Sequence, residues 1–238
     1  MMSAIDPPSA FELLRRFRNE KTEPEPFYVG LADRTIAGFP YPLHDQVVLD
    51  LGCGPGWYSV ALKRAGASVV SLDLGREDVE AAKGRGVAAF VGDGQDLPFS
   101  KSSLDAVFCS NLLEHVPEPL KVIDEIARVL KPGGWAWISW TPWFSPWGGH
   151  EIVPLHLLGP TLGPKTWERL FGPPRKNIPY EGLWPTYVGA ITDSVRADDR
   201  FIVDSIHPRY YPAMKWIMSV PGLREFGSWN CVIAATRR

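Results

Sequence analysis

Three closely spaced glycines mark the segment of this sequence with the clearest chemical capacity. The stretch Val48 to Gly56 reads VLDLGCGPG, so an apolar run leads directly into Gly52, Gly54 and Gly56. Glycine allows a sharp turn after a strand and lets a ligand approach the backbone closely. Any turn from a strand into a helix can use glycine, so the spacing alone is a weak signal. The spacing predicts a ligand-binding loop only if the neighbouring segments also have the features of such a site.

Polar side chains follow the next three apolar runs. Asp73 ends the second run, Asp93 follows the third and Asn111 follows the fourth. The carboxyl ends of parallel strands lie along one edge of a sheet, where such folds bind their ligands. Asp73 stands 17 residues after Gly56, a place from which a carboxylate can accept both hydroxyls of a ribose. The pattern therefore predicts a ribose-containing ligand at this edge.

Alternating strands and helices must position these residues. The apolar runs lack polar alternation, which is typical of parallel strands buried on both faces. Strand–helix alternation predicts an α/β protein with a doubly wound parallel sheet. The expected strands are 47–51, 68–72, 87–91, 104–109 and 135–140, with closing strands at 201–207 and 230–236, and the expected helices are 58–65, 76–83 and 119–130.

The regions before and after these elements, residues 1–45 and 141–198, lack the regular strand–helix alternation. A helix is expected over 10–17 and another within 27–36. Nine of the 23 prolines fall between residues 142 and 185, and a long irregular segment of this kind is usually a lid or a binding region. We expect a single domain over 1–238, built from a helical cap 1–45, a cofactor-binding core 46–140, a lid 141–198 and closing strands 199–238.

Composition excludes several classes of protein. The chain has 238 residues, 45% hydrophobic and 22% charged, with a net charge of −2, which indicates a folded protein and argues against a generic nucleic-acid binder. Cys53, Cys109 and Cys231 are too few for a disulfide framework and lack metal-ligand spacing. Neither a signal-peptide layout nor an apolar run of about 18 residues is present. A soluble, cytoplasmic protein is expected.

Aromatic residues gather after the fifth expected strand. Seven of the ten tryptophans lie within residues 135–184. Aromatic faces bind the apolar faces of sugar rings and of flat or lipidic molecules. His150 and Glu151 lie in the same region, about ten residues beyond the strand.

Five ordered blocks resemble a known family. They are VLDLGCGPG, Asp73, GDGQDLPF (92–99), SLDAVFCSNLLEHV (103–116) and EIARVLKPGG (125–134). Together they resemble the class I S-adenosylmethionine-dependent methyltransferases of the methyltransferase-11 type. The resemblance implies S-adenosylmethionine as cofactor and a Rossmann-like, doubly wound, seven-stranded sheet with the last strand antiparallel. A nicotinamide-binding protein would need Gly-x-Gly-x-x-Gly, and the third glycine here comes one residue early.

The same resemblance implies cofactor contacts. The glycines would line the methionine part, Asp73 would hold the ribose hydroxyls, and Asp50 would act from beneath the loop. The segment at 93–94 would face the adenine, and that at 111–112 would flank the sulfonium. Tyr28 could close over the cofactor or simply pack. The expected cofactor-binding residues are Tyr28, Asp50, Gly52, Cys53, Gly54, Gly56, Asp73, Leu74, Asp93, Gly94, Asn111 and Leu112.

A narrower resemblance covers the C-terminal half. The motifs WGGHE (147–151), LHLLG (155–159), HPRYYP (207–212) and SVPGLREF (219–226) resemble bacterial methyltransferases found among polysaccharide and cell-envelope genes. The N-terminal FRNEKTEPEPFY (17–28) fits the same group. The resemblance implies a hydroxyl on a sugar or polysaccharide precursor as the acceptor.

A hydroxyl that attacks a methyl group must lose its proton, and a histidine with a pKa near 6.5 suits that task. His150 is the predicted general base, with Glu151 orienting it or binding substrate, although His150 could equally pack under the lid. His156 is the second candidate, although its leucine neighbours suggest packing. The expected substrate-binding residues are Trp143, Trp147, His156, Tyr180 and Trp184.

Several alternatives remain open. The greasy stretch LHLLGPTL (155–162) would also suit a lipidic or aromatic acceptor. A non-catalytic binding protein of the same fold would be expected to have a broken glycine loop, and the loop is intact. A divalent metal such as magnesium is conceivable, but no ligand spacing is visible. The expected partner is a small-molecule or oligosaccharide acceptor, without nucleic acid or stable membrane association, and the oligomeric state is left open.

Overall fold

The computed structural model describes residues 7–20 and 22–238. The expectation about the N-terminal layout rests partly on residues 1–6, which lie outside the described residues. The chain divides into two compact units, one ending at Asp93 and one beginning at Gly94. Each unit is described by itself, and the single-domain organisation stays a prediction.

The seven strands form a mixed sheet of strand order β3-β2-β1-β4-β5-β7-β6. The last strand, β7, runs antiparallel to both β5 and β6. This confirms the predicted Rossmann-like fold class. The strands are β1 Val47–Leu51, β2 Ser68–Asp73, β3 Ala88–Val91, β4 Leu104–Ser110, β5 Leu130–Trp140, β6 Phe201–Pro208 and β7 Cys231–Arg237.

The first unit contains three parallel strands and four helices. Ser9 caps the first helix, because its side chain accepts a hydrogen bond from Glu12 N at 3.2 Å. The second helix starts at Pro24, earlier than predicted, because proline suits the first turn of a helix. The helices are α1 Ala10–Phe17, α2 Pro24–Ala37, α3 Trp57–Arg64 and α4 Arg76–Gly84.

The second unit contains β4 to β7 and the remaining helices. Strand β5 begins at Leu130 instead of 135, and its pairing with β4 shifts register between Leu104 and Ala106. The α-helices are α5 Pro119–Val129, α6 Leu162–Phe171, α7 Val188–Ala197 and α8 Leu223–Gly227. The short 3-10 helices are η1 Leu113–His115, η2 His150–Ile152, η3 Leu155–Leu158 and η4 Pro212–Ser219.

Helix α7 corrects the predicted extent of the irregular segment. It buries Val188, Ile191 and Val195 on one face, and it packs against α5 and β6. It is therefore one of the helices that flank the strands. The irregular part of the chain ends near Tyr187, not at 198, because Val188, Ile191 and Val195 recur at helical spacing, a signal that the prediction of a long irregular segment passed over.

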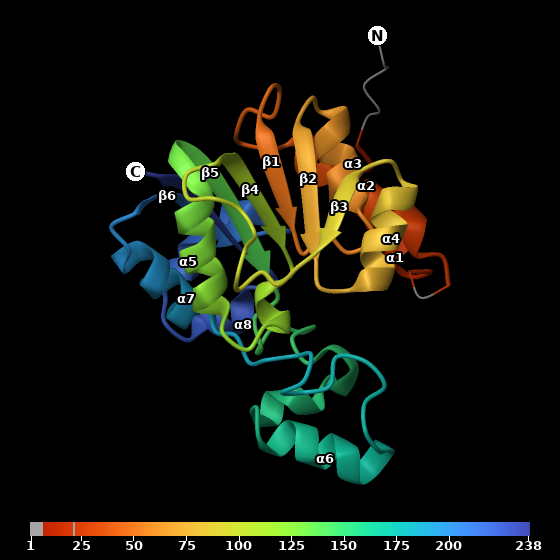
Figure 1. Ribbon diagram of the computed structural model, residues 1–238. Helices are drawn as coiled ribbons and strands as arrows, with labels where there is room; N and C mark the ends of the chain where they lie inside the picture. Colours follow the sequence, from red (N-terminus) through yellow and green to blue (C-terminus); the bar gives the residue numbers. More distant parts are fainter. Residues whose placement is uncertain (1–6, 21) are drawn as a thin grey trace. The chain divides into compact units, whose positions relative to one another are not determined.

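The irregular part of the expected lid, residues 141–187, has a small core of its own and is called the lid below. Trp143, Ile152 and Leu183 are buried together, with Trp167 among the half-buried side chains packed against them. Within the second unit, α6 stands apart from the strands, beyond the ends toward which β4 and β5 run (Figure 1). Among the described residues, no helix combines the length and the apolar character needed to cross a membrane. The cytoplasmic location stays a prediction.

Candidate functional site

The glycine loop of the first unit adopts backbone conformations that other residues avoid. Gly52, Gly54 and Gly56 have φ angles of 72°, 49° and 86°, in the region that glycine tolerates best. A Cβ on Gly56 would also lie 2.9 Å from Cβ of Ala82. Gly52 N donates a hydrogen bond to Leu72 O at 2.8 Å, which ties the loop to the end of β2.

Asp73 is held by the loop that it faces. Its Oδ2 accepts from Gly54 N and its Oδ1 from Gly75 N, both at 2.8 Å. These two bonds fix the rotation of the carboxylate, and each oxygen keeps a further lone pair for a hydroxyl. Leu74, next along the chain, is 72% exposed and offers an apolar surface. Gly92 N donates to Asp73 O at 2.9 Å, so the segment leading to Asp93 follows β2.

Asp50 and Cys53 lie beneath this surface. Asp50 is buried, and its Oδ2 accepts a 2.5 Å hydrogen bond from Ser59 Oγ, which in turn accepts one from Ser71 Oγ at 2.9 Å. Burial, with repulsion from Asp73 as a smaller cause, raises the pKa of Asp50 to about 7. Burial also raises the pKa of the Cys53 thiol. Both residues therefore support the loop from below.

Two further residues of the first unit bear on the site. Tyr28 donates from its hydroxyl to Glu20 Oε1 at 2.8 Å, which agrees with a packing role, and its closure over a cofactor stays a prediction. Arg85, which sequence reasoning missed, donates to Pro55 O at 3.1 Å and lies 3.7 Å from the ring centroid of Trp57. Arg85 therefore contacts the residues immediately before and after Gly56.

In the second unit, Asn111 lies at the end of β4. Its φ of 56° turns the chain, and its Oδ1 accepts from Asn230 Nδ2 at 3.0 Å. Arg209, another residue that the sequence did not single out, donates to Ser110 Oγ at 3.0 Å. Asn111 is exposed and Leu112, at its side, is half-buried. Both predicted residues thus lie at the carboxyl end of β4, as expected.

The predicted substrate-binding residues divide into interior and exposed sets. Trp143 and His156 are buried, with Trp143 Nε1 donating to His156 O at 3.1 Å and His156 Nε2 donating to Ser145 O at 2.9 Å. That burial argues against direct contact with a substrate. Trp147 is 49% exposed and Tyr180 is exposed as well. Trp184, the fifth, is half-buried.

Glu151 does not orient His150. Its Oε2 accepts from the backbone N–H groups of Arg175 and Lys176 at 2.7 and 2.9 Å. It therefore holds the chain at 175–176. The residue beside the His150 ring is Asn177, whose Nδ2 lies 3.4 Å from Nδ1 of His150.

His150 is half-buried at the start of η2. In the described part of the chain its buried Nε2 has no hydrogen-bond partner. Burial lowers the pKa of His150 to about 4, helped by the nearby His115 and His156. The imidazole is therefore neutral at pH 7, with a lone pair available for a proton or another electrophile.

Two neighbours of His150 come from η1: Glu114, which the sequence did not single out, and His115, which the sequence suggested would pack structurally beside the cofactor pocket. Glu114 is 1% exposed, and its Oε1 accepts from Thr141 N at 3.0 Å. Its buried Oε2 has no partner within residues 7–20 and 22–238, and burial raises its pKa despite His115 nearby. His115 Nδ1 lies 2.7 Å from Gly182 O. Glu114 and His115 are adjacent in the block NLLEHV, but nothing in the sequence indicates that they lie near His150 in the folded chain.

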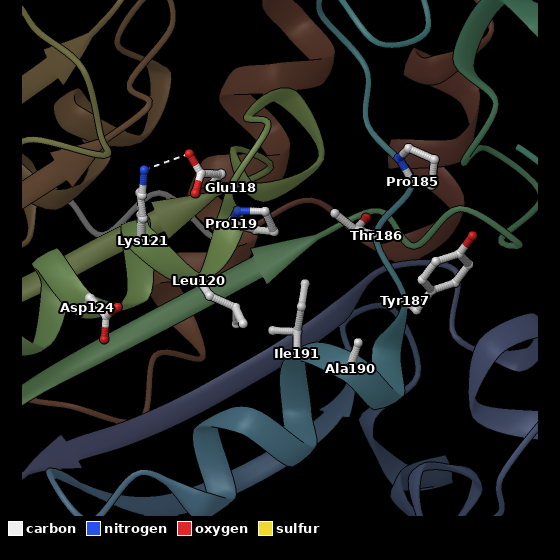
Figure 2. Close-up of a pocket in the computed structure, with 10 residues that line it drawn as sticks. All are labelled: Glu118, Pro119, Leu120, Lys121, Asp124, Pro185, Thr186, Tyr187, Ala190 and Ile191. Atoms are coloured by element: carbon white, nitrogen blue, oxygen red, sulfur yellow. Dashed lines mark hydrogen bonds and ion pairs between the residues drawn. The ribbon is translucent and has the colours of Figure 1, made fainter.

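A separate pocket of about 350 Å³ lies between α5, the chain at 185–187 and α7. Figure 2 shows Leu120, Ala190 and Ile191 on its apolar side, with Lys121 turned toward Glu118. Lys121 Nζ lies 2.6 Å from Glu118 Oε1, in an ion pair. None of the described residues predicted for the site lines this pocket, so we assign it no chemistry.

Known proteins resemble this chain along nearly its whole length. A methyltransferase domain model matches residues 49–138. The chain is 33% identical to an uncharacterized methyltransferase of Mycobacteroides abscessus, over 95% of this chain and 93% of that protein. It is 34% identical to an uncharacterized methyltransferase of Mycobacterium tuberculosis, over 95% of this chain and 94% of that protein.

Two solved structures share the fold. An S-adenosylmethionine-dependent methyltransferase from Mesorhizobium loti has a TM-score of 0.64 at 20% identity, covering 89% of this chain and 100% of that one. A geranyl diphosphate methyltransferase in complex with S-adenosylmethionine has a TM-score of 0.59 at 20% identity, covering 99% and 94%.

Proposed function

Because the chain belongs to the family of class I S-adenosylmethionine-dependent methyltransferases, we propose that it methylates a hydroxyl of a sugar or polysaccharide precursor. The enzyme class and the methyl donor follow from the family. The acceptor is a small molecule, and its chemical nature is the subject of the proposal.

The residues of the first unit that are expected to bind the donor leave groups free that suit it. S-adenosylmethionine supplies an electrophilic methyl carbon on a sulfonium sulfur. Asp73 would hold the ribose hydroxyls with the lone pairs that Gly54 and Gly75 leave free, and Leu74 would contact the adenine. The glycine loop would let the methionine part approach the backbone. Asp93, Gly94, Asn111 and Leu112 keep the roles that the family resemblance implies.

The main support for the acceptor proposal is the turn of the lid that contains Trp147 and His150. His150 N donates to Trp147 O at 2.9 Å, so the neutral imidazole and the exposed indole belong to the same turn. An exposed aromatic face can stack on the apolar face of a sugar ring. A lone pair beside it can accept the proton of a ring hydroxyl. The C-terminal motifs, which in the sequence resemble methyltransferases of polysaccharide genes, led to the same expectation.

The reaction is an in-line displacement. The hydroxyl oxygen attacks the methyl carbon, the carbon–sulfur bond breaks, and a methyl ether and S-adenosylhomocysteine form. Nε2 of His150 accepts the hydroxyl proton as the oxygen attacks. Correct alignment of the two partners supplies most of the rate.

A lipidic acceptor is the second candidate. Leu157, Leu158 and Leu162 are all about half exposed in the lid, and an apolar acceptor would cover them. The geranyl diphosphate methyltransferase that shares this fold carries an isoprenoid substrate in its name. These leucines lie outside the turn that holds His150, so we rank this acceptor second.

A panel assay tests the proposal. The purified protein is incubated with labelled S-adenosylmethionine and separate sets of glycosides, isoprenoids and quinones. We expect label in the glycosides, and an Asp73→Asn variant should lose it. Label in isoprenoids or quinones alone would replace the sugar acceptor with the lipidic one.

A further inference from the structure

The three side chains Glu114, His115 and His150 have the composition of a metal site. One ligand atom from each lies within 4.8 Å of the other two. We propose that these side chains bind one divalent transition-metal ion, such as Zn²⁺. The binding site stands on its own geometry, and only its consequence for catalysis rests on the function proposed above.

Two buried atoms in this cluster lack a partner. Across the described ranges 7–20 and 22–238, neither Oε2 of Glu114 nor Nε2 of His150 takes part in a hydrogen bond. Buried polar groups are nearly always paired, because an unpaired one loses its hydration without compensation. A carboxylate oxygen and an imidazole nitrogen left free at the same place are what a cation would satisfy.

In His115 and Glu114, the side-chain atom that would not bind the ion already has a hydrogen-bond partner. A carbonyl oxygen only accepts, so Nδ1 of His115 carries the proton that it shares with Gly182 O at 2.7 Å. In the neutral ring Nε2 then has the free lone pair, the usual arrangement of a metal-binding histidine. Oε1 of Glu114 accepts from Thr141 N at 3.0 Å, which fixes the carboxylate. Both ligands are therefore oriented before an ion arrives.

His150 needs only a small change. Asn177 Nδ2 lies 3.4 Å from Nδ1 of His150. The oxygen and nitrogen of an amide exchange places by a half-turn of the group, after which Asn177 Oδ1 would accept a proton on Nδ1. That proton position leaves Nε2 free as a ligand.

The donor set favours zinc over magnesium. Two imidazole nitrogens and one glutamate oxygen form the protein ligands of many catalytic zinc sites, which keep the fourth position open. Tetrahedral zinc would bring its ligand atoms to roughly 3.4 Å from one another, within reach of small side-chain rotations from the present separation. Magnesium prefers an all-oxygen shell and fits this cluster poorly.

A bound ion would change how the acceptor hydroxyl is activated. The ion would take the lone pair of His150 that otherwise accepts the proton. A hydroxyl bound at the open position becomes more acidic, and its proton then passes to solvent as the oxygen attacks the methyl carbon. His150 would serve as a ligand in the loaded enzyme and as a base only in the empty one.

Calorimetric titration with zinc chloride alone tests the site. The full chain, stripped with a chelator, should bind one ion per chain without donor or acceptor present. Glu114→Gln, His115→Ala and His150→Ala should each weaken binding at least tenfold. His44→Ala is the matched control, because His44 is 80% exposed beside Asp45. No stoichiometric binding, or wild-type affinity in all three ligand variants, would overturn the proposal.

A second readout separates binding from misfolding and from catalysis. Glu114→Gln keeps an oxygen to accept from Thr141 N, so it should fold. Zinc should raise the melting temperature of the wild type and of His44→Ala but not of Glu114→Gln, and an equal rise in all three would contradict the site. Neither readout involves methyl transfer, so the site and the proposed acceptor chemistry can fail separately.

Discussion

His115 and His150 meet edge to face, with ring centroids 5.1 Å apart and an interplanar angle of 68°. The first ends η1, just after β4, and the second begins η2 in the lid. Two imidazoles thus join the lid to the segment that follows β4 within the second unit. An aliphatic pair could fill the same space, but it would offer no lone pairs for proton transfer or metal binding.

Removing the His150 imidazole should slow methyl transfer. We expect His150→Ala to lower turnover by about 10²–10⁴-fold, the usual scale for a positioned acid–base group. Affinity for S-adenosylhomocysteine, measured by calorimetry, should not change. His44→Ala should keep wild-type turnover, and full activity in His150→Ala would remove this residue from the mechanism.

Removing a bound metal ion should also lower the rate of methyl transfer. Treatment with a strong chelator should lower turnover of the wild type, because the open coordination position no longer acidifies the hydroxyl. Zinc should restore turnover and magnesium should not. Chelated enzyme that turns over at the untreated rate would show that methyl transfer needs no metal ion.

Asp73 should control donor affinity. Asp73→Asn removes the negative charge and replaces one accepting oxygen with a donor, so one ribose hydroxyl would lose its charged acceptor and one of the two backbone N–H groups would lose its partner. Hydrogen bonds to charged groups contribute about 1.5–3 kcal/mol, so S-adenosylhomocysteine should bind about 10- to 100-fold more weakly. Asp45→Asn, at a side chain that is 85% exposed, is the control. Unchanged affinity in Asp73→Asn would refute the ribose assignment.

Asp50 should make stability depend on pH. Its pKa is raised from 3.8 to about 7 by burial, so between these values the folded state binds a proton that the unfolded state has released. Stability should therefore fall as pH rises from about 4 to 7 and stay level above that, by about 4 kcal/mol at most.

Urea unfolding from pH 5 to 8 measures this contribution of Asp50. The asparagine of the Asp50→Asn variant cannot ionise, and its amide oxygen can still accept from Ser59. The stability of this variant should therefore fall less as pH rises. Comparison of the two proteins cancels the other titrating groups. Parallel curves for the wild type and Asp50→Asn would show that Asp50 does not titrate in this range.

Trp147 should contribute to acceptor binding. Aromatic contacts contribute about 0.5–1.5 kcal/mol, so Trp147→Ala should raise the acceptor KM by about 2- to 10-fold while kcat changes less. Trp216→Ala removes another exposed tryptophan, in η4, and should leave KM unchanged. An equal KM for Trp147→Ala and the wild type would place the acceptor elsewhere.

Most strands and helices of the first unit were predicted to within about a residue, although α2 begins earlier than expected. Apolar runs, glycines and strand-end carboxylates follow one another over short stretches, and β1, β2 and α4 end within a residue of their expected limits. Local chemistry decides such features: a positive φ favours glycine at Gly54 and Gly56, and a parallel strand buried on both faces favours an unbroken apolar run.

The lid shows what sequence patterns could not predict. Trp143 and Trp147 are the same residue type four positions apart, yet one is buried and the other is 49% exposed. Glu151 was expected to orient His150 or to bind substrate, and its carboxylate instead accepts hydrogen bonds from the backbone at 175–176. The burial of a tryptophan and the partner of a carboxylate depend on contacts between segments that are distant in the sequence. Neither periodicity nor motif spacing predicts such contacts.

The residues alone were enough to predict the fold class, the glycine loop and the family, because each depends on contiguous residues with strong local preferences. Only the tertiary structure brought Glu114, His115 and His150 together. Their proximity results from the path of the lid, which the packing of Trp143, Ile152 and Leu183 sets. The ability of this cluster to bind a proton or a metal ion arises from burial and unpaired lone pairs, which exist only once the chain has folded.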